Sequence, residues 1–339
     1  VDELADHDTL GIVTFSDRAE VVVQSQQLTN RARIHNHISS IWTSGGTEIL
    51  QGMELGLEEV RRFQTDSALS HLLLLTDGQT YGDERGCLAA SRRARQERIT
   101  ISTLGLGEDW NDRLLEEMAQ LAGGTCSYVA HPRQLRHVLN DYLRNLSGVV
   151  ARDLICTVRL SESTRLVDAF RCTSTVDRLA VDQGEIKLGI LQGGGHIQVL
   201  MELVITAEGE GKRRLVQLEL SGRGPHSDQR ERLVFDYEVT FVQDLVPEPE
   251  NVPMAIVNAM NRVNLFRMQE SAWEALEAGR AGDARQQLEA VATRLLDLGE
   301  KELAQIALLE AGRVTEGGRA SKKGQKTIRF GTRRLGGRV

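Results

Sequence analysis

Short apolar runs alternate with amphipathic stretches through the first 148 residues. The run at 71–76 holds four consecutive leucines, too few to cross a membrane and typical of a strand buried on both faces of a parallel sheet. Residues 48–63 place apolar side chains on one side at helical spacing. Repeated strands and helices of this length predict an α/β fold with a doubly wound, mostly parallel sheet. The expected strands are 9–16, 20–26, 71–76, 99–104 and 124–130, the first two forming a hairpin, and the expected helices are 31–42, 48–63, 84–97, 109–121 and 133–146.

The pattern changes after residue 148. Residues 149–245 alternate apolar and polar side chains in runs separated by turn signals, which predicts an antiparallel β-sandwich. Residues 250–315 are rich in Ala, Leu and Glu and predict a C-terminal helical hairpin. Residues 316–339 are rich in Gly, Lys and Arg and predict a basic flexible tail. The expected domains are therefore 1–148, 149–245 and 250–315, followed by the tail.

Charge is distributed unevenly along the chain. The net charge is -7, but eight of the 41 Lys and Arg residues lie from Gly317 onward, where there is no acid. The body of the protein is therefore acidic, which argues against nucleic-acid binding by the main domain, because phosphate neutralisation needs clustered cations. The basic end could contact nucleic acid, an anionic membrane or an acidic partner, although a solvated tail is the simpler interpretation.

The four cysteines show no metal-ligand spacing and predict reduced, mostly buried thiols in a reducing compartment. No apolar run approaches the roughly 20 residues that span a bilayer. These features predict a cytoplasmic protein without a transmembrane segment. The chain begins at Val1 without an initiator Met, so an upstream signal or anchor remains compatible with the sequence.

Two oxygen-bearing side chains form the candidate site. Asp77 follows the leucine strand directly, at the strand end where open α/β sheets bind their ligands. Thr47 follows a glycine pair and opens the predicted helix 48–63, which precedes the leucine strand in the sequence. Its hydroxyl could therefore reach the same crevice. The alternative is structural: Asp77-Gly78 as a turn and Thr47 as a helix cap.

Three blocks of the sequence together resemble a von Willebrand factor type A (VWA) domain. They are residues 10–17, residues 45–49 with Gly52 following, and residues 72–78. In that family a metal-ion-dependent adhesion site (MIDAS) combines an Asp-x-Ser-x-Ser loop, a Thr and an Asp. Thr47 matches the Thr and Asp77 matches the Asp, whereas the Asp-x-Ser-x-Ser loop has no match here. In the family this loop follows a central first strand. The resemblance therefore implies an N-terminally truncated, VWA/Rossmann-like domain in which that strand is absent between the strands 9–16 and 71–76.

The resemblance implies a metal-dependent protein–protein interaction module, acting as a binding or assembly scaffold and not as an enzyme. Mg²⁺, or else Mn²⁺ or Ca²⁺, suits hydroxyl and carboxylate ligands, and an acidic side chain of a protein partner would complete the coordination. With two ligands from this chain, affinity should be low. Two alternatives stay open: an α/β hydrolase or phosphatase using Asp77, and an assembly subunit working with an AAA+ type ATPase. The remaining domains resemble those of bacterial-type proteins that carry this domain.

Overall fold

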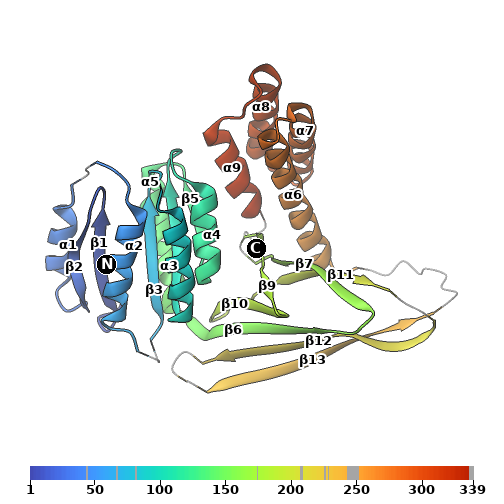
Figure 1. Ribbon diagram of the computed structural model, residues 1–339, viewed down its shortest axis with the longest axis horizontal. Coiled ribbons are helices and arrows are strands. Elements are labelled where there is room, and N and C mark those ends of the chain that lie inside the picture. The colour runs from blue at the N-terminus through green and yellow to red at the C-terminus, as the bar shows by residue number, and fades with distance from the viewer. Residues whose placement is uncertain are drawn as a thin grey trace. The chain divides into compact units, whose positions relative to one another are not determined.

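The computed structural model describes residues 1–42, 45–65, 68–80, 82–173, 175–206, 209–224, 227, 229–242 and 252–335. The chain divides into two compact units, Val1–Arg152 with Arg223–Gln229, and Asp153–Gly222 with Arg230–Val339 (Figure 1). The predicted boundary between residues 245 and 250 lies outside the described residues. Within the described parts, no helix is both long enough and apolar enough to cross a membrane.

The first unit is an α/β domain with a parallel sheet, as the alternating pattern predicts (Figure 1). Strands β3, β4 and β5 pair in parallel in that order, and β1 and β2 form the predicted antiparallel hairpin. The strands are β1 Thr9–Phe15, β2 Ala19–Gln27, β3 Ser70–Thr76, β4 Ile99–Leu106 and β5 Cys126–Val129. The helices are α1 Arg31–Ser39, α2 Ile49–Arg61, α3 Glu84–Gln96, α4 Asp112–Ala122 and α5 Pro132–Ser147.

In the described part of this unit, the strands form two sheets instead of one continuous sheet. One sheet is β1–β2, and the other is β3–β4–β5 with β3 at its end. Alternate residues from Ser70 to Thr76 are buried, and the residues between them are half-buried. The expectation that this strand is buried on both faces is therefore wrong, because one face of this end strand is covered less completely than the other.

Helix α2 packs against both sheets and joins them into one unit. Gly52 allows the helix to approach Phe15 of β1, since a Cβ at this position would lie 2.5 Å from the ring. At the other end of α2, Glu59 is 3% exposed and accepts a hydrogen bond from the backbone N–H of Ser25 at 2.6 Å. The Ser25 hydroxyl in turn donates to the Glu59 carbonyl oxygen at 2.8 Å. These contacts fix α2 on the hairpin.

In the part of the second unit that the structure describes, the strands form two β-sheets of mainly antiparallel character. One has the strand order β13-β12-β6-β10-β9 and the other has the order β11-β7-β8. Leu154, Cys156 and Val158 alternate along β6 and are buried, which is the pattern of a strand with one face in the core. The strands are β6 Val149–Leu160, β7 Thr164–Arg171, β8 Asp177–Arg178, β9 Val181–Asp182, β10 Glu185–Gln192, β11 Val199–Ile205, β12 Gly211–Arg223 and β13 Arg230–Phe241.

The described residues of this unit also form four helices, which are α6 Met254–Glu277, α7 Ala281–Asp297, α8 Lys301–Gly317 and α9 Lys322–Arg333. The predicted hairpin at 250–315 is thus three helices, and its core continues into α9 through Ile328. The predicted flexible tail at 316–339 is wrong for the described residues. Composition suggested disorder, but α9 is a helix in which Ile328 and Phe330 are both buried.

Buried charges and caps explain why α9 is ordered. Ser321 caps the helix by accepting a hydrogen bond from Gly324 N–H at 2.9 Å. The arginines on its buried side are partly neutralised, since Arg329 and Arg333 lie 3.5 and 3.7 Å from a carboxylate oxygen of Glu270 on α6. A sequence rich in cations therefore forms a packed helix once a neighbouring helix supplies the counter-charge.

Helix α6 is attached to the strands of the same unit. Arg262 donates hydrogen bonds to the carbonyl oxygens of Cys172 at 2.5 Å and Thr173 at 3.1 Å. Around it, Phe170 of β7 packs with Val263 and Phe266 of α6 in a small apolar core. Burial lowers the pKa of the Arg262 guanidinium. The carbonyl oxygens accept hydrogen bonds from one of its terminal nitrogens, whereas its buried Nε has no hydrogen-bond partner among the described residues.

Candidate functional site

Three loops meet at one edge of the first unit, and backbone hydrogen bonds tie two of them together. The loop after β1 contributes Asp17, and the loop before α2 contributes Gly46 and Thr47. Asp17 accepts a hydrogen bond from Gly46 N–H at 2.9 Å, and Ser16 carbonyl oxygen accepts one from Glu48 N–H at 2.8 Å. The start of α2 is therefore held at the end of β1, with Thr47 between the two hydrogen-bonded residues.

The third loop, which follows β3, brings Gly78 against Thr47. Gly78 follows Asp77, and a side chain added at Gly78 would collide with the Thr47 hydroxyl. The hydroxyl thus lies directly against the backbone at the end of β3, as the position of the two residues in the sequence predicts. The Thr76 hydroxyl accepts a hydrogen bond from Gly78 N–H at 3.2 Å and shapes the turn. Thr47 is half-buried, and Asp77 is exposed.

Asp83 connects the β3–α3 loop to helix α2. Its carboxylate accepts hydrogen bonds from the Thr80 hydroxyl at 2.6 Å and from Leu50 N–H at 2.9 Å. Leu50 lies in the first turn of α2, where backbone N–H groups lack helical partners, so Asp83 satisfies one of them from another loop. Sequence reasoning missed Asp17, Thr80 and Asp83, because the available signal was only an acid or hydroxyl in a loop.

Thr47 and Asp77 offer oxygen atoms, the type of ligand that hard divalent cations prefer, but they are only two residues. Thr47 offers a hydroxyl oxygen and Asp77 a carboxylate, both of which Mg²⁺ accepts together with water. Over the residues that the structure describes, His, Cys, Asp and Glu side chains form no group of three or more that could hold a metal ion. The two residues can thus supply part of a coordination sphere, and waters or a partner must supply the remaining ligands.

The titratable groups with large pKa shifts lie elsewhere in the first unit. Burial lowers the pKa of His71, on β3, to about 4, and its ring nitrogen contacts the Tyr142 hydroxyl of α5. Burial also raises the pKa of Cys87, on α3, to about 12. Cys87, Cys126, Cys156 and Cys172 are free thiols, and all except the half-buried Cys126 are buried, as predicted. Neutral, buried thiols are poor nucleophiles, so burial lowers the reactivity expected of Cys87, Cys156 and Cys172.

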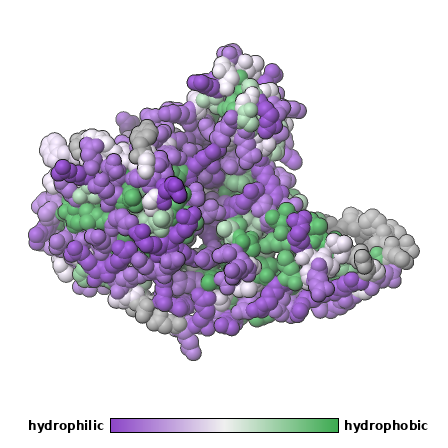
Figure 2. Space-filling model, viewed as in Figure 1, coloured by the Kyte–Doolittle hydropathy of each residue, from purple (hydrophilic) through white to green (hydrophobic). Residues whose placement is uncertain are grey.

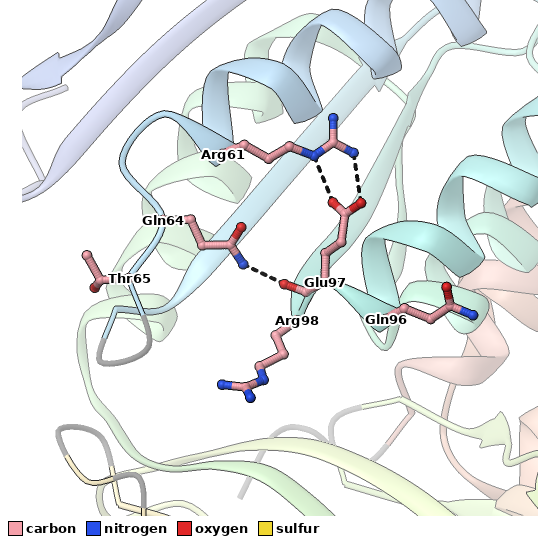
Figure 3. A pocket seen from close by; sticks show the side chains of 6 residues that line it. All are labelled: Arg61, Gln64, Thr65, Gln96, Glu97 and Arg98. Carbon is pink, nitrogen blue, oxygen red and sulfur yellow. Dashed lines mark hydrogen bonds and ion pairs between the residues drawn. The ribbon is translucent and has the colours of Figure 1, made fainter.

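A surface pocket lies at the opposite end of the sheet. Figure 3 shows its lining side chains at the end of α2 and just before β4. Arg61 and Glu97 form a two-point ion pair across it, with contacts of 2.8 and 3.2 Å, and Gln64 donates to the Glu97 carbonyl oxygen at 2.5 Å. Because Thr47 precedes the start of α2 and Asp77 follows the end of β3, this pocket is separate from the candidate site.

Comparison with known proteins supports a VWA assignment. Residues 1–141 match the family model of the von Willebrand factor type A domain, and residues 254–338 match that of the Sll0103-like, C-terminal alpha-helical domain. The uncharacterized protein sll0103 of Synechocystis sp. is 28% identical over 338 residues, covering 97% of this chain and 80% of that protein. The uncharacterized protein YfbK of Escherichia coli is 24% identical over 216 residues, covering 61% of this chain but only 37% of that protein.

A solved structure shares the fold over nearly the whole chain. The von Willebrand factor type A protein from Catenulispora acidiphila superposes with a TM-score of 0.77 at 14% identity, covering 98% of this chain and 82% of that one. At this identity the likeness concerns the fold alone. It extends through both units, so the strands and helices after residue 152 belong to an arrangement already seen beside this domain. Residues 1–141 are therefore similar to a von Willebrand factor type A domain, and residues 254–338 are similar to the Sll0103-like helical domain, with β-strands between them.

Proposed function

We propose that the VWA domain binds a protein partner through a divalent cation held by Thr47 and Asp77. The contact between the Thr47 hydroxyl and the Gly78 backbone carries the proposal, because it brings the only two matched MIDAS residues to one edge of the sheet. Mg²⁺ or Mn²⁺ would take the Thr47 and Asp77 oxygens, and an acidic side chain of the partner would take an open position. The chemistry supplied by the cation is electrostatic bridging of two oxygen ligands.

The surrounding hydrogen bonds support this role. Asp17 and Asp83 are engaged with the backbone of the loop and helix that flank Thr47, so they fix the position of Thr47 and leave it half-buried. Asp77 is exposed, which suits a ligand that meets a partner at the surface. The alternative, a hydrolase that uses Asp77, would need a base within hydrogen-bonding reach of its carboxylate.

The test is calorimetric titration of the 339-residue chain with Mn²⁺ and Mg²⁺. Thr47→Ala and Asp77→Ala should each weaken binding at least about tenfold. Thr9→Ala, at the other end of β1, and Asp182→Ala, in the second unit, are exposed matched controls that should bind like the unchanged chain. Binding that survives in the Asp77→Ala protein, or no binding in the unchanged chain, would contradict the proposal that these residues hold the cation.

The partner class is addressed by a second measurement. A pull-down from cell extract, run in Mg²⁺ and in a chelator, should recover a protein that the chelator releases and that Asp77→Ala does not retain. An AAA+ type ATPase among the chelator-released proteins would assign the chain to assembly with that class of enzyme. Retention that is insensitive to both the chelator and Asp77→Ala would place the partner surface elsewhere.

A further inference from the structure

Strand β13 is a long edge strand whose side chains are almost all exposed. It pairs with β12 at the end of the five-stranded sheet, and every residue from Arg230 to Thr240 is exposed. Its odd positions carry large apolar groups from Leu233 onward, and Leu233, Phe235 and Tyr237 are 58%, 50% and 57% exposed. A long apolar edge strand can pair with another strand unless charges or bulges prevent it.

The apolar face of β13 continues the buried face of its sheet. The even positions of β13 face the polar side chains of β12, as the Lys212–Glu238 and Arg214–Asp236 ion pairs show. On that same polar face, Arg159 of β6 pairs with Glu219. The buried even positions of β6, such as Cys156, must then lie on the opposite face, together with the odd positions of β13. Figure 2 shows that hydrophobic surface gathers over the strands of this unit.

The charged side chains at the even-numbered positions of β13 follow a self-complementary order. Reading along β13, the even positions are Arg230, Arg232, Val234, Asp236 and Glu238. Reversal of the strand about Val234 therefore exchanges the two cations with the two acids. Strand β12 already uses this complementarity, since Arg232 lies 3.7 Å from Glu219 while Asp236 lies 3.4 Å from Arg214. Like charges along the edge would repel a second β13, whereas this order attracts one.

We infer that β13 pairs antiparallel with β13 of a second copy of the chain, about a two-fold axis at Val234. This register places Arg232 opposite the partner's Asp236 and Arg230 opposite the partner's Glu238. The two-fold axis generates each of these pairs twice. On the other face it places Leu233 opposite the partner's Phe235, so apolar side chains meet apolar ones. A shift by one residue would set apolar groups against charges, and an axis at Asp236 would oppose two acids. The contact is isologous and closes on a dimer.

Charge reversal separates this interface from a defect in folding. Sedimentation of the 339-residue chain up to about 100 µM should show a dimer. Arg230→Glu with Arg232→Glu, and separately Asp236→Arg with Glu238→Arg, should each weaken it at least about tenfold, because each strand then repels its own copy. An equimolar mixture of the two variants should restore the dimer. Circular dichroism melting checks that each variant is folded, since exposed ion pairs contribute little to stability.

Cross-linking tests the register. A short thiol-specific linker should join two chains carrying Val234→Cys but not two chains carrying Val181→Cys, which lies on the opposite edge strand β9 of the same sheet. A chain that remains monomeric at every concentration, or a mixture of reversed variants that stays monomeric, would overturn the inference and leave β13 for a different occupant. A dimer that is insensitive to both reversals would overturn it as well.

Discussion

Glu310 on α8 accepts hydrogen bonds from both the backbone N–H and the hydroxyl of Ser321, at 2.6 and 2.7 Å. Ser321 is the N-cap of α9, so a carboxylate on one helix positions the start of the next. The Glu310 side chain is 2% exposed and also pairs with Arg313 at 2.6 Å. Its hydrogen bonds therefore couple the order of α9 to the packing of the helical domain.

Glu310→Ala should destabilise the second unit by about 1–3 kcal/mol, because the half-buried donors of Ser321 lose their acceptor. Glu316→Ala, an exposed acid on the same helix, is the matched control and should change stability by less than about 0.5 kcal/mol. Urea denaturation followed by circular dichroism measures both. Equal losses in the two variants would show that Glu310 has no special part in holding α9.

Gly78→Ala should destabilise the first unit by about 1–3 kcal/mol, because the added methyl group overlaps the Thr47 hydroxyl. The double variant Thr47→Ala/Gly78→Ala should recover part of this loss, since the colliding atom is gone. Denaturation of the two single variants and the double variant gives the coupling. Gly282→Ala, on α7 with open space around it, should be neutral or stabilising. Additive effects at 47 and 78 would contradict the contact.

Glu59→Ala should cost about 1–3 kcal/mol of unfolding free energy, because the Ser25 N–H on β2 loses its carboxylate acceptor in a buried setting. Its neighbour Glu58 is exposed on the same helix, and Glu58→Ala should have little effect. Hydrogen exchange at Ser25 provides a local readout, which should accelerate only in the Glu59 variant. Unchanged exchange there would show that α2 is held on the hairpin by apolar contacts alone.

The buried imidazole of His71 should make the protein less stable in mild acid. Its pKa falls from about 6.5 in the unfolded chain to about 4 in the folded one, so the unfolded state takes up the proton first as pH drops. The stabilising contribution is present above pH 6.5 and is lost as pH falls towards 4, with an upper limit of about 3 kcal/mol.

Urea denaturation at pH 7, 6 and 5 measures this loss. His71→Phe removes the titrating group and should flatten the decline between pH 6.5 and 5, whatever its effect at pH 7. His7→Gln replaces an imidazole that is 86% exposed and should leave the decline unchanged. An identical slope in the unchanged chain and the His71 variant would assign the acid sensitivity to other groups.

Local patterns in the sequence predicted the order of the elements and the type of most of them. The apolar run at 71–76 and the helical spacing at 48–63 indicate β3 and α2, because burial of a strand or a helix face imposes its own period on the sequence. Three blocks that resemble the VWA family also pointed to the domain in residues 1–141 and to its edge containing Thr47 and Asp77. The metal and the partner remain predictions.

Composition gave a wrong prediction for the C-terminal residues, because contacts with distant parts of the chain compensate their positive charge. The cation-rich end at 322–333 reads as a solvated tail, yet Glu270 and Glu310 lie on α6 and α8 and provide charge and capping for α9. Likewise, no local signal shows that Asp83 satisfies the start of α2 or that Tyr142 covers His71. Such partners are distant in the sequence, and only the packed chain decides which polar groups meet.

The amino-acid sequence alone thus determined the helices and strands that follow from local hydrophobic periodicity, and the acidic body of the chain. It also indicated the two candidate oxygen ligands beside neighbouring strand and helix ends. The tertiary structure decided which face of β3 is less covered, that α9 is ordered, and that β13 carries a self-complementary edge. The physical reason is that burial and charge compensation depend on side chains brought together from far along the chain, whereas the period of a helix or strand does not.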